Sequence, residues 1–170
     1  MSLLEWDQYY LGICDAVAKN SKCLSRKIGA ILVKDKSIIA TGYNGPPRGI
    51  PHCSCRYSLD PVIKELIKGK SIDANKCPRY NLGYKSGEGL ELCVAGHAER
   101  NALINAARHG VCVKDSTLYM NANIPCKDCL IELINAGIIE IVITEIKLYD
   151  KVSKYLIDSS CLNIRKFEGV

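Results

Sequence analysis

The segment 116–144, STLYMNANIPCKDCLIELINAGIIEIVIT, decides the fold class of this chain. Its two ends, STLYMNA at 116–122 and IIEIVIT at 138–144, have the composition of strands. Residues 126–135 between them have the apolar spacing of a helix. Strands that alternate with helices in this way indicate an α/β layered fold.

The rest of the chain continues this pattern. KIGAILV and SIIATGY flank the polar triplet KDK and predict a β-hairpin, which makes the sheet mixed. The other predicted elements are helices at 3–20, 97–108 and 152–158 and an edge strand at 163–167. With the hairpin and the two strands of 116–144, we expect a mixed sheet of five strands.

Composition narrows the class of protein. A chain of 170 residues with 48% hydrophobic and 24% charged residues is expected to fold as one domain spanning 1–170. MSLLEWDQYY does not resemble a signal peptide, and no apolar run is long enough to span a membrane, so the cytoplasm is the expected compartment. Thiols stay reduced there, and ten cysteines therefore favour metal binding over disulfides. The net charge of +5 is mild, and neither nucleic acid nor a membrane is an expected partner.

One stretch, at about 44–93, departs from the regular pattern. It is rich in Gly, Pro and Cys, and only 62–68 within it has the pattern of a short helix. A loop of this length without structure of its own is uncommon in a compact domain. We therefore expect an additional constraint to hold it together.

Two short motifs, HAE and PCKDC, together contain the ligands of a zinc site. Pro125 suits the start of a helix, whose first turn then carries Cys126 and Cys129 on one face. The helix dipole favours thiolates at this end. Two sulfurs leave a tetrahedral ion short of a ligand, and His97 can provide it. Three protein ligands and one open position are typical of a catalytic zinc.

Glu99 is the candidate general base of this site. Zinc lowers the pKa of bound water to about 7, and a base must then take the proton and deliver it elsewhere. Glu99 shares a helical face with Leu103 and Ala106, and a carboxylate on an apolar stripe usually has a partner or a task. The alternatives for the two cysteines are a redox pair and a purely structural zinc.

The order H-x-E followed by P-C-x-x-C resembles the signature of zinc deaminases. WDQYYLGICDAVAKNSKC, KIGAILVKDKSIIATGYNGPPRG, HAERNAL and INAGI are together similar to deoxycytidylate (dCMP) deaminases, members of the cytidine/deoxycytidylate deaminase family. The resemblance implies a three-layer α-β-α, cytidine deaminase-like fold and hydrolysis of dCMP to dUMP and ammonia, which supplies dUMP for thymidylate synthesis. It also implies that Glu99 carries the proton. The catalytic zinc ligands that it implies are His97, Cys126 and Cys129.

The same resemblance suggests which residues hold the nucleotide. Asn44 is expected in the substrate pocket near the sugar, although an Asn-Gly pair also simply favours a turn. Arg108 follows His97 by 11 positions, a rise of about 16.5 Å along a helix, so a nucleotide fits between zinc and guanidinium. A cation near a helix C-terminus is favourable in any case. Arg26 is the rival ligand for the phosphate.

A second, structural zinc is also implied by the resemblance. The expected ligands of this closed four-thiolate site are Cys23, Cys53, Cys77 and Cys93, with Cys55 and His52 as substitutes. Such a site would hold the 44–93 stretch together. Free buried cysteines are the alternative, and Cys14, Cys112 and Cys161 are predicted to pack in the core.

The resemblance further implies a homo-oligomer, commonly a hexamer, that dCTP activates together with Mg²⁺ and dTTP inhibits. Two rival functions stay open at this point. One is deamination of another substrate, such as dCTP, a nucleoside or a tRNA base. The other is a zinc-stabilised binding protein without turnover.

Overall fold

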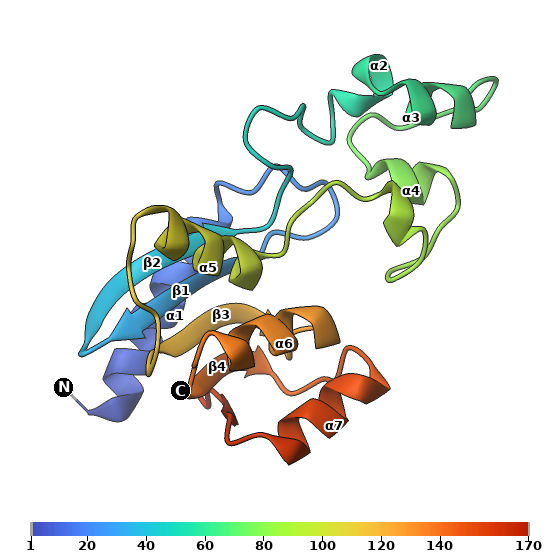
Figure 1. Ribbon diagram of the computed structural model, residues 1–170. Helices are drawn as coiled ribbons and strands as arrows, with labels where there is room; N and C mark the ends of the chain where they lie inside the picture. Colours follow the sequence, from blue (N-terminus) through green and yellow to red (C-terminus); the bar gives the residue numbers. More distant parts are fainter. Residues whose placement is uncertain (1, 170) are drawn as a thin grey trace. The chain divides into compact units, whose positions relative to one another are not determined.

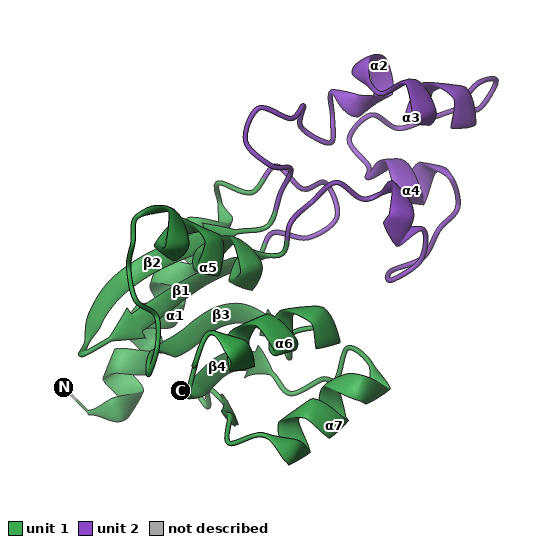
Figure 2. Ribbon diagram, in the orientation of Figure 1, with its two compact units in different colours: residues 1–21, 28–44, 97–170 green, residues 22–27, 45–96 purple. Residues whose placement is uncertain are grey.

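The computed structural model describes residues 2–169, which divide into two compact units (Figure 2). The first unit comprises the chain up to 21, 28–44 and the chain from 97 onward, and the second comprises 22–27 and 45–96. The second unit thus contains nearly all of the stretch that the sequence singles out at about 44–93. The organisation of the chain as one domain stays a prediction.

The first unit contains the regular elements that the sequence predicts, with ends shifted by at most a few residues. They are α1 (Leu3–Ala18), β1 (Gly29–Lys34), β2 (Ser37–Tyr43), α5 (Ala98–Arg108), β3 (Thr117–Asn123), α6 (Lys127–Asn135), β4 (Glu140–Glu145), α7 (Lys151–Ser159) and β5 (Asn163–Lys166). Within residues 2–169, no helix combines the length and the apolar character that crossing a bilayer requires.

The five strands form one mixed sheet, as predicted, and their order is β2-β1-β3-β4-β5. β1 runs antiparallel to β2 and β3, whereas β3, β4 and β5 are parallel to one another. Asp35 and Lys36 connect β1 to β2 with positive φ angles of 49° and 58°, the conformation of a two-residue hairpin turn. The parallel pairs are connected through α6 and α7, as parallel strands require a crossover.

Helices cover both faces of the sheet, which confirms the three-layer prediction (Figure 1). Successive strand residues point to opposite faces. On one face, Ile31, Tyr119 and Val142 pack with α1 residues such as Leu11. The other face, covered by α5, α6 and α7, buries Ala30, Leu32, Leu118, Met120, Ile141 and Ile143.

Gly42 lets α5 approach the edge strand β2 closely. A Cβ atom at this position would lie within 3.0 Å of the backbone of Ala98 and Ala102. Side-chain amides of α5 reinforce the contact, because Asn101 Nδ2 donates to the Tyr43 carbonyl at 2.8 Å. The position of α5 along the sheet is therefore set at its first two turns.

The second unit contains only short helices: α2 (Arg56–Leu59), α3 (Pro61–Leu66), α4 (Pro78–Asn81) and the 3₁₀ turn η1 (Leu90–Leu92). The sequence predicts α3 alone, because helices of four residues are too short to show an apolar period. The buried Arg56 guanidinium donates to Asp60 at 2.6 Å and to the Leu92 carbonyl at 2.7 Å. This side chain ties α2 to the segment before Cys93.

Two of the three cysteines predicted in the core are not there. Cys14 is fully buried, but Cys112 and Cys161 are exposed. Cys112 lies between α5 and β3, and Cys161 lies between α7 and β5. Connecting segments run over the surface of a domain, and this overrides the apolar preference of the side chain.

We predict that Gly42→Ala lowers the free energy of unfolding by about 1–3 kcal/mol, because α5 or β2 must shift to admit the methyl group. Gly12→Ala is the matched control, since a Cβ at Gly12 on α1 meets nothing within 4 Å. This control is expected to be neutral or to stabilise by roughly 0.5–1 kcal/mol, as Ala is the better helix former. Urea unfolding of the two variants measures both effects. Equal stabilities would contradict the close packing of α5 on β2.

Candidate metal centre

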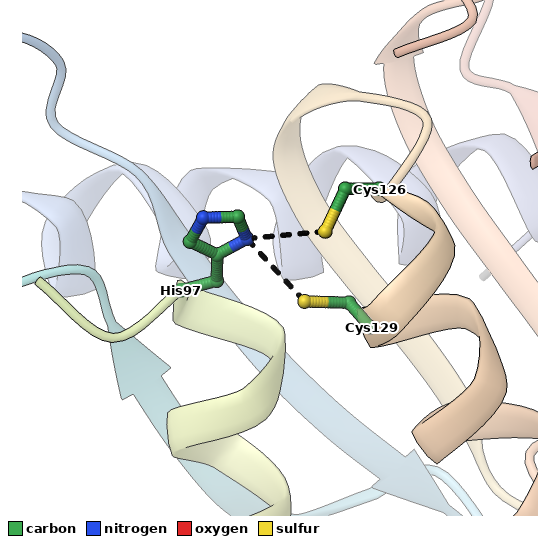
Figure 3. Close-up of side chains that lie close together, drawn as sticks. All are labelled: His97, Cys126 and Cys129. Atoms are coloured by element: carbon green, nitrogen blue, oxygen red, sulfur yellow. Dashed lines mark hydrogen bonds between the residues drawn. The ribbon is translucent and has the colours of Figure 1, made fainter. Parts of the chain in front are cut away.

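Three donor groups converge from the starts of two helices (Figure 3). His97 is the N-cap of α5 and Cys126 is the N-cap of α6, and neither side chain makes a capping hydrogen bond. Cys129 lies in the first turn of α6. Both caps thus turn their side chains away from their own helices and toward each other. The sequence placed all three residues near helix starts, and the structure brings them together.

The distances fit a zinc ion. His97 Nδ1 lies 3.5 Å from Cys126 Sγ and 3.3 Å from Cys129 Sγ. All three donor atoms lie within 4.8 Å of one another. With Zn–S near 2.3 Å and Zn–N near 2.0 Å, a nitrogen and a sulfur ligand of a tetrahedral ion are about 3.5 Å apart. The group therefore suits a metal with three protein ligands and one open position.

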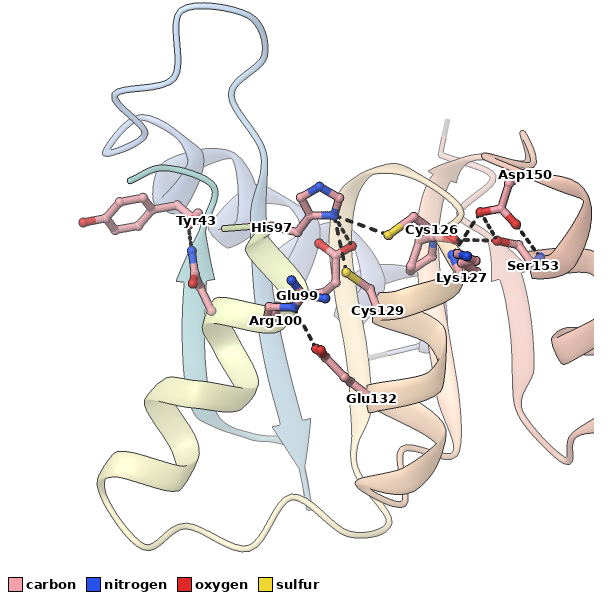
Figure 4. Close-up of polar contacts among 12 residues, drawn as sticks. Tyr43, His97, Glu99, Arg100, Cys126, Lys127, Cys129, Glu132, Asp150 and Ser153 are labelled. Atoms are coloured by element: carbon pink, nitrogen blue, oxygen red, sulfur yellow. Dashed lines mark hydrogen bonds and ion pairs between the residues drawn. The ribbon is translucent and has the colours of Figure 1, made fainter. Parts of the chain in front are cut away.

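Glu99 lies beside this group and is 4% exposed. Its Oε1 atom is 3.7 Å from His97 Nδ1 (Figure 4). Burial disfavours the ionised carboxylate, but the hydrogen bond and the charge of His97 outweigh burial and lower the pKa of Glu99. A buried, ionised carboxylate next to a metal ligand is well placed to exchange protons at the open position.

The pKa values of the three donor groups are shifted in different directions before any metal binds. A hydrogen bond from Cys129 lowers the pKa of Cys126 to about 4 and raises the pKa of Cys129 itself. Hydrogen bonds to Cys126 and then to Glu99 raise the pKa of His97 to about 10. The contacts within the group thus favour the thiolate form of Cys126 and the protonated forms of Cys129 and His97.

A cation beside the two sulfurs was missed by the sequence reasoning. Arg100 Nε donates to Glu132 at 2.9 Å and so bridges α5 and α6 (Figure 4). Glu132 and then the charges of Cys129 and Cys126 raise the pKa of Arg100. Its guanidinium favours the thiolate forms in return. The motif HAER includes the arginine, but no local pattern in the sequence indicates Glu132, its partner on another helix.

Asn44 lies close to His97 through a backbone bridge. Gly45 and Gly96, the residues after Asn44 and before His97, exchange hydrogen bonds of 3.1 and 2.9 Å. The side-chain Oδ1 of Asn44 accepts from the backbone N–H of Ile28 at 2.8 Å, which fixes the orientation of the amide. Asn44 is thus a buried neighbour of the metal centre, and it lies directly after β2 rather than in a turn.

The two candidate phosphate ligands lie in different parts of the chain. Arg108 is exposed and ends α5, at the opposite end from His97, in agreement with the predicted spacing. Arg26 belongs to the second unit, whereas His97 belongs to the first. The binding roles of both arginines stay predictions.

The second unit gathers the four cysteines that the sequence assigns to a structural zinc. Burial raises the pKa of Cys53 to about 11, and the charges of Cys23, Cys77 and Cys93 raise it as well. Among the residues that the structure describes, only His97, Cys126 and Cys129 have donor atoms that all lie within 4.8 Å of one another, so the second zinc stays a prediction. The backbone N–H of Ser25 also donates to Cys23 Sγ at 3.4 Å.

Comparison with known proteins identifies the family. The sequence model "Cytidine and deoxycytidylate deaminase zinc-binding region" matches residues 4–145. The chain belongs to the cytidine and deoxycytidylate deaminase family. The matched zinc-binding region includes His97, Cys126 and Cys129.

Curated relatives extend this similarity over most of the chain. The deoxycytidylate deaminase of Mycobacterium phage D29 is 35% identical over 147 residues, which cover 84% of this chain and 96% of the relative. The deoxycytidylate deaminase of Schizosaccharomyces pombe is 31% identical over 162 residues, which cover 95% of this chain and 44% of the relative. This chain thus spans less than half the length of the S. pombe relative and of its Saccharomyces cerevisiae counterpart.

Among solved structures, the dCMP deaminase of cyanophage S-TIM5 in complex with dCMP and dUMP has a similar fold. The TM-score is 0.68 and the sequence identity 22%, with 98% of each chain covered. The cytidine deaminase-like fold predicted from the sequence is confirmed by this match.

We predict that Zn²⁺ binding to the His97, Cys126 and Cys129 group releases about two protons at pH 7, because metal ligands must be deprotonated. The two protons are those that the three donors share before the metal binds. The apparent zinc affinity should therefore rise with pH. The expected slope is about two in log affinity per pH unit, in the range between the pKa of Cys126, about 4, and that of His97, about 10. Calorimetry in buffers of different ionisation enthalpy counts the protons. Release of none would contradict the proton distribution described above.

Proposed function

We propose that this chain is a zinc-dependent deaminase that hydrolyses dCMP to dUMP and ammonia. The observation that carries the proposal is the convergence of His97, Cys126 and Cys129 beside the buried Glu99. The choice of dCMP is supported by the names of the relatives and by the nucleotides in the S-TIM5 complex. Formation of dUMP for thymidylate synthesis would be the cellular role.

The chain's own residues would divide the reaction between them. His97, Cys126 and Cys129 hold the zinc, which when bound supplies hydroxide from water at neutral pH. Glu99 accepts the proton that the water gives up and delivers it to the departing amino group. The oxygen stays on the ring carbon as the carbonyl of dUMP, its remaining proton passes to the adjacent ring nitrogen, ammonia leaves, and the carboxylate ends as it began. Burial keeps the carboxylate away from bulk water during the transfer.

We assign Asn44 to the sugar of the nucleotide. The Gly45–Gly96 bridge next to His97 supports this assignment, and the fixed orientation of the amide suits a binding role. Arg108 and Arg26 are the two candidates for the phosphate, and the position of Arg108 at the far end of α5 favours it. A nucleotide would then extend along α5 from the metal toward the guanidinium.

Cys23, Cys53, Cys77 and Cys93 are proposed to bind a second, structural zinc. Their mutual effect on the pKa of Cys53 supports this ligand set over one that includes Cys55. His52 is exposed and is the weaker substitute. Helices of four to six residues bury little apolar surface, so a metal would supply much of the stability of the second unit.

Regulation and assembly follow from the family and extend the proposal. We expect a homo-oligomer, commonly a hexamer in this family, with dCTP and Mg²⁺ as activators and dTTP as inhibitor. A cytoplasmic location accords with ten cysteines that are all free. Neither nucleic acid nor a membrane is part of the proposed function.

We predict that Glu99→Gln lowers the turnover of dCMP by about 10²–10⁴-fold, the usual contribution of a general acid–base group, while bound zinc is retained. Glu65→Gln on the exposed face of α3 is the matched control and should leave turnover unchanged. Absorbance assays should cover dCMP, dCTP, cytidine and a tRNA stem-loop, each with and without added dCTP effector and Mg²⁺. Preference for the tRNA would defeat the proposed substrate. No turnover of any of these substrates by the wild type, together with unchanged folding and zinc binding in Glu99→Gln, would favour a zinc-stabilised binding protein.

We predict two zinc ions per chain in the purified protein, measured by elemental analysis against protein concentration. Cys77→Ser should reduce this to about one and destabilise the second unit, since structural zinc contributes directly to folding. Cys112→Ser replaces an exposed cysteine outside the second unit and should keep both ions. One zinc in the wild type would remove the second site but leave the catalytic one.

A further inference from the structure

α6 starts at a residue that does not cap it. Cys126 occupies the N-cap position with extended backbone angles of φ −67° and ψ 163°. Its sulfur faces His97 Nδ1 at 3.5 Å and, apart from its contact with Cys129, makes no capping hydrogen bond to the helix that follows. The first N–H groups of a helix lack intrahelical partners and need an acceptor from elsewhere.

Asp150 provides that acceptor from the start of α7 (Figure 4). The backbone N–H of Lys127, directly after Cys126, donates to Asp150 Oδ2 at 3.0 Å. Asp150 is also the N-cap of α7, where it accepts from Ser153 N at 2.7 Å and from Ser153 Oγ at 2.9 Å. One carboxylate therefore caps two helices, and it joins the α6 start to the α7 start.

Ser153 completes the contact from the other side. Its side chain is fully buried, and Oγ lies 3.4 Å from the carbonyl oxygen of Pro125. The peptide groups before and after Cys126 thus both face this pair, through the Pro125 carbonyl and the Lys127 N–H. We call Asp150 and Ser153 the α7 clamp.

The α7 clamp contacts the backbone around Cys126, the metal-ligand residue of α6 that this helix restrains least. Cys129 lies within α6, where helical hydrogen bonds hold its backbone. The Cys126 carbonyl accepts the first helical bond from Leu130 N at 2.9 Å, but Cys126 itself has extended angles outside the helix. Burial disfavours the ionised Asp150, but the N–H groups of Ser153 and Lys127 outweigh it and lower its pKa. Charge-assisted hydrogen bonds of this kind are stronger than neutral ones.

We propose that Asp150 and Ser153 are positioning residues, which hold the backbone of Cys126 so that its sulfur meets the metal together with His97 and Cys129. The inference rests on the zinc ligands of the proposed function. Groups that orient a metal ligand from outside the coordination sphere typically change metal affinity by 10–100-fold when they are removed. The segment between β4 and α7 is thereby part of the metal centre, although it contributes no ligand.

The test is zinc affinity, measured in the full chain by competition with a chelator. Asp150→Ala should bind zinc about 10–100-fold more weakly than the wild type. Asp150→Asn keeps one acceptor oxygen and should lose less. Ser153→Ala keeps the Asp150–Lys127 hydrogen bond and should also be intermediate. With Co²⁺ in place of zinc, the thiolate charge-transfer band of Asp150→Ala should differ most from that of the wild type, by weakening or shifting. The band of Ser153→Ala should be intermediate.

Tyr155→Gly is the matched control. Tyr155 lies on α7 and is 69% exposed, so glycine weakens the helix without removing a group of the clamp. This variant should bind zinc and Co²⁺ like the wild type. An equal loss of affinity in Tyr155→Gly would overturn the proposal, because general stability of α7 would then be the cause. Circular dichroism identifies variants that do not fold, and if Asp150→Ala is one of them, Asp150→Asn and Ser153→Ala decide the question.

The outcomes also separate this inference from the proposed function. A wild-type chain that binds no zinc would overturn the proposed function and the inference together. Tight zinc binding in the wild type, with unchanged affinity and an unchanged Co²⁺ spectrum in folded Asp150 and Ser153 variants, would overturn the inference alone. Both readouts are independent of which nucleotide the enzyme prefers.

Discussion

The metal centre requires the N-terminal ends of α5 and α6 to lie next to each other. The packing of both helices on the sheet places them there. α5 is held against β2 at Gly42, and α6 connects the parallel strands β3 and β4. The N-terminal ends of both helices therefore lie at one edge of the sheet, with His97 before one and Cys126 before the other. A shift of either helix by one residue would rotate its donor away, so the catalytic chemistry depends on strand register and helix packing.

The convergence of these donor groups also brings several groups that can carry negative charge close together, and the surrounding residues offset their repulsion. Two sulfurs, an imidazole and the buried Glu99 carboxylate lie close together. The positive ends of two helices and the Arg100 guanidinium favour the anionic forms. A divalent ion would satisfy the donors directly, and Glu99 would be left as the proposed proton carrier. The same arrangement therefore accounts for metal binding and for the proposed acid–base role.

The second unit is stabilised by different physical means. Its helices are short, and the polar contacts of Arg56 and Asp60 connect segments that share little apolar surface. The second zinc that we propose fits this picture, because it would take the place of a hydrophobic core in this unit. Apolar periodicity could not predict α2 or α4, since a single helical turn contains no repeat.

Local pattern in the sequence was sufficient for the strands, the long helices and the two ligand motifs, because each depends on residues a few positions apart. Contacts between distant residues were not accessible in this way. The Arg100–Glu132 pair and the bond from Lys127 to Asp150 join residues 32 and 23 positions apart, and they form only when the helices pack. The exposure of Cys112 was likewise decided by the path of the chain over the surface. Sequence alone thus determined which groups are the candidates for metal binding and proton transfer, whereas tertiary packing decided which neighbours orient and charge-balance them.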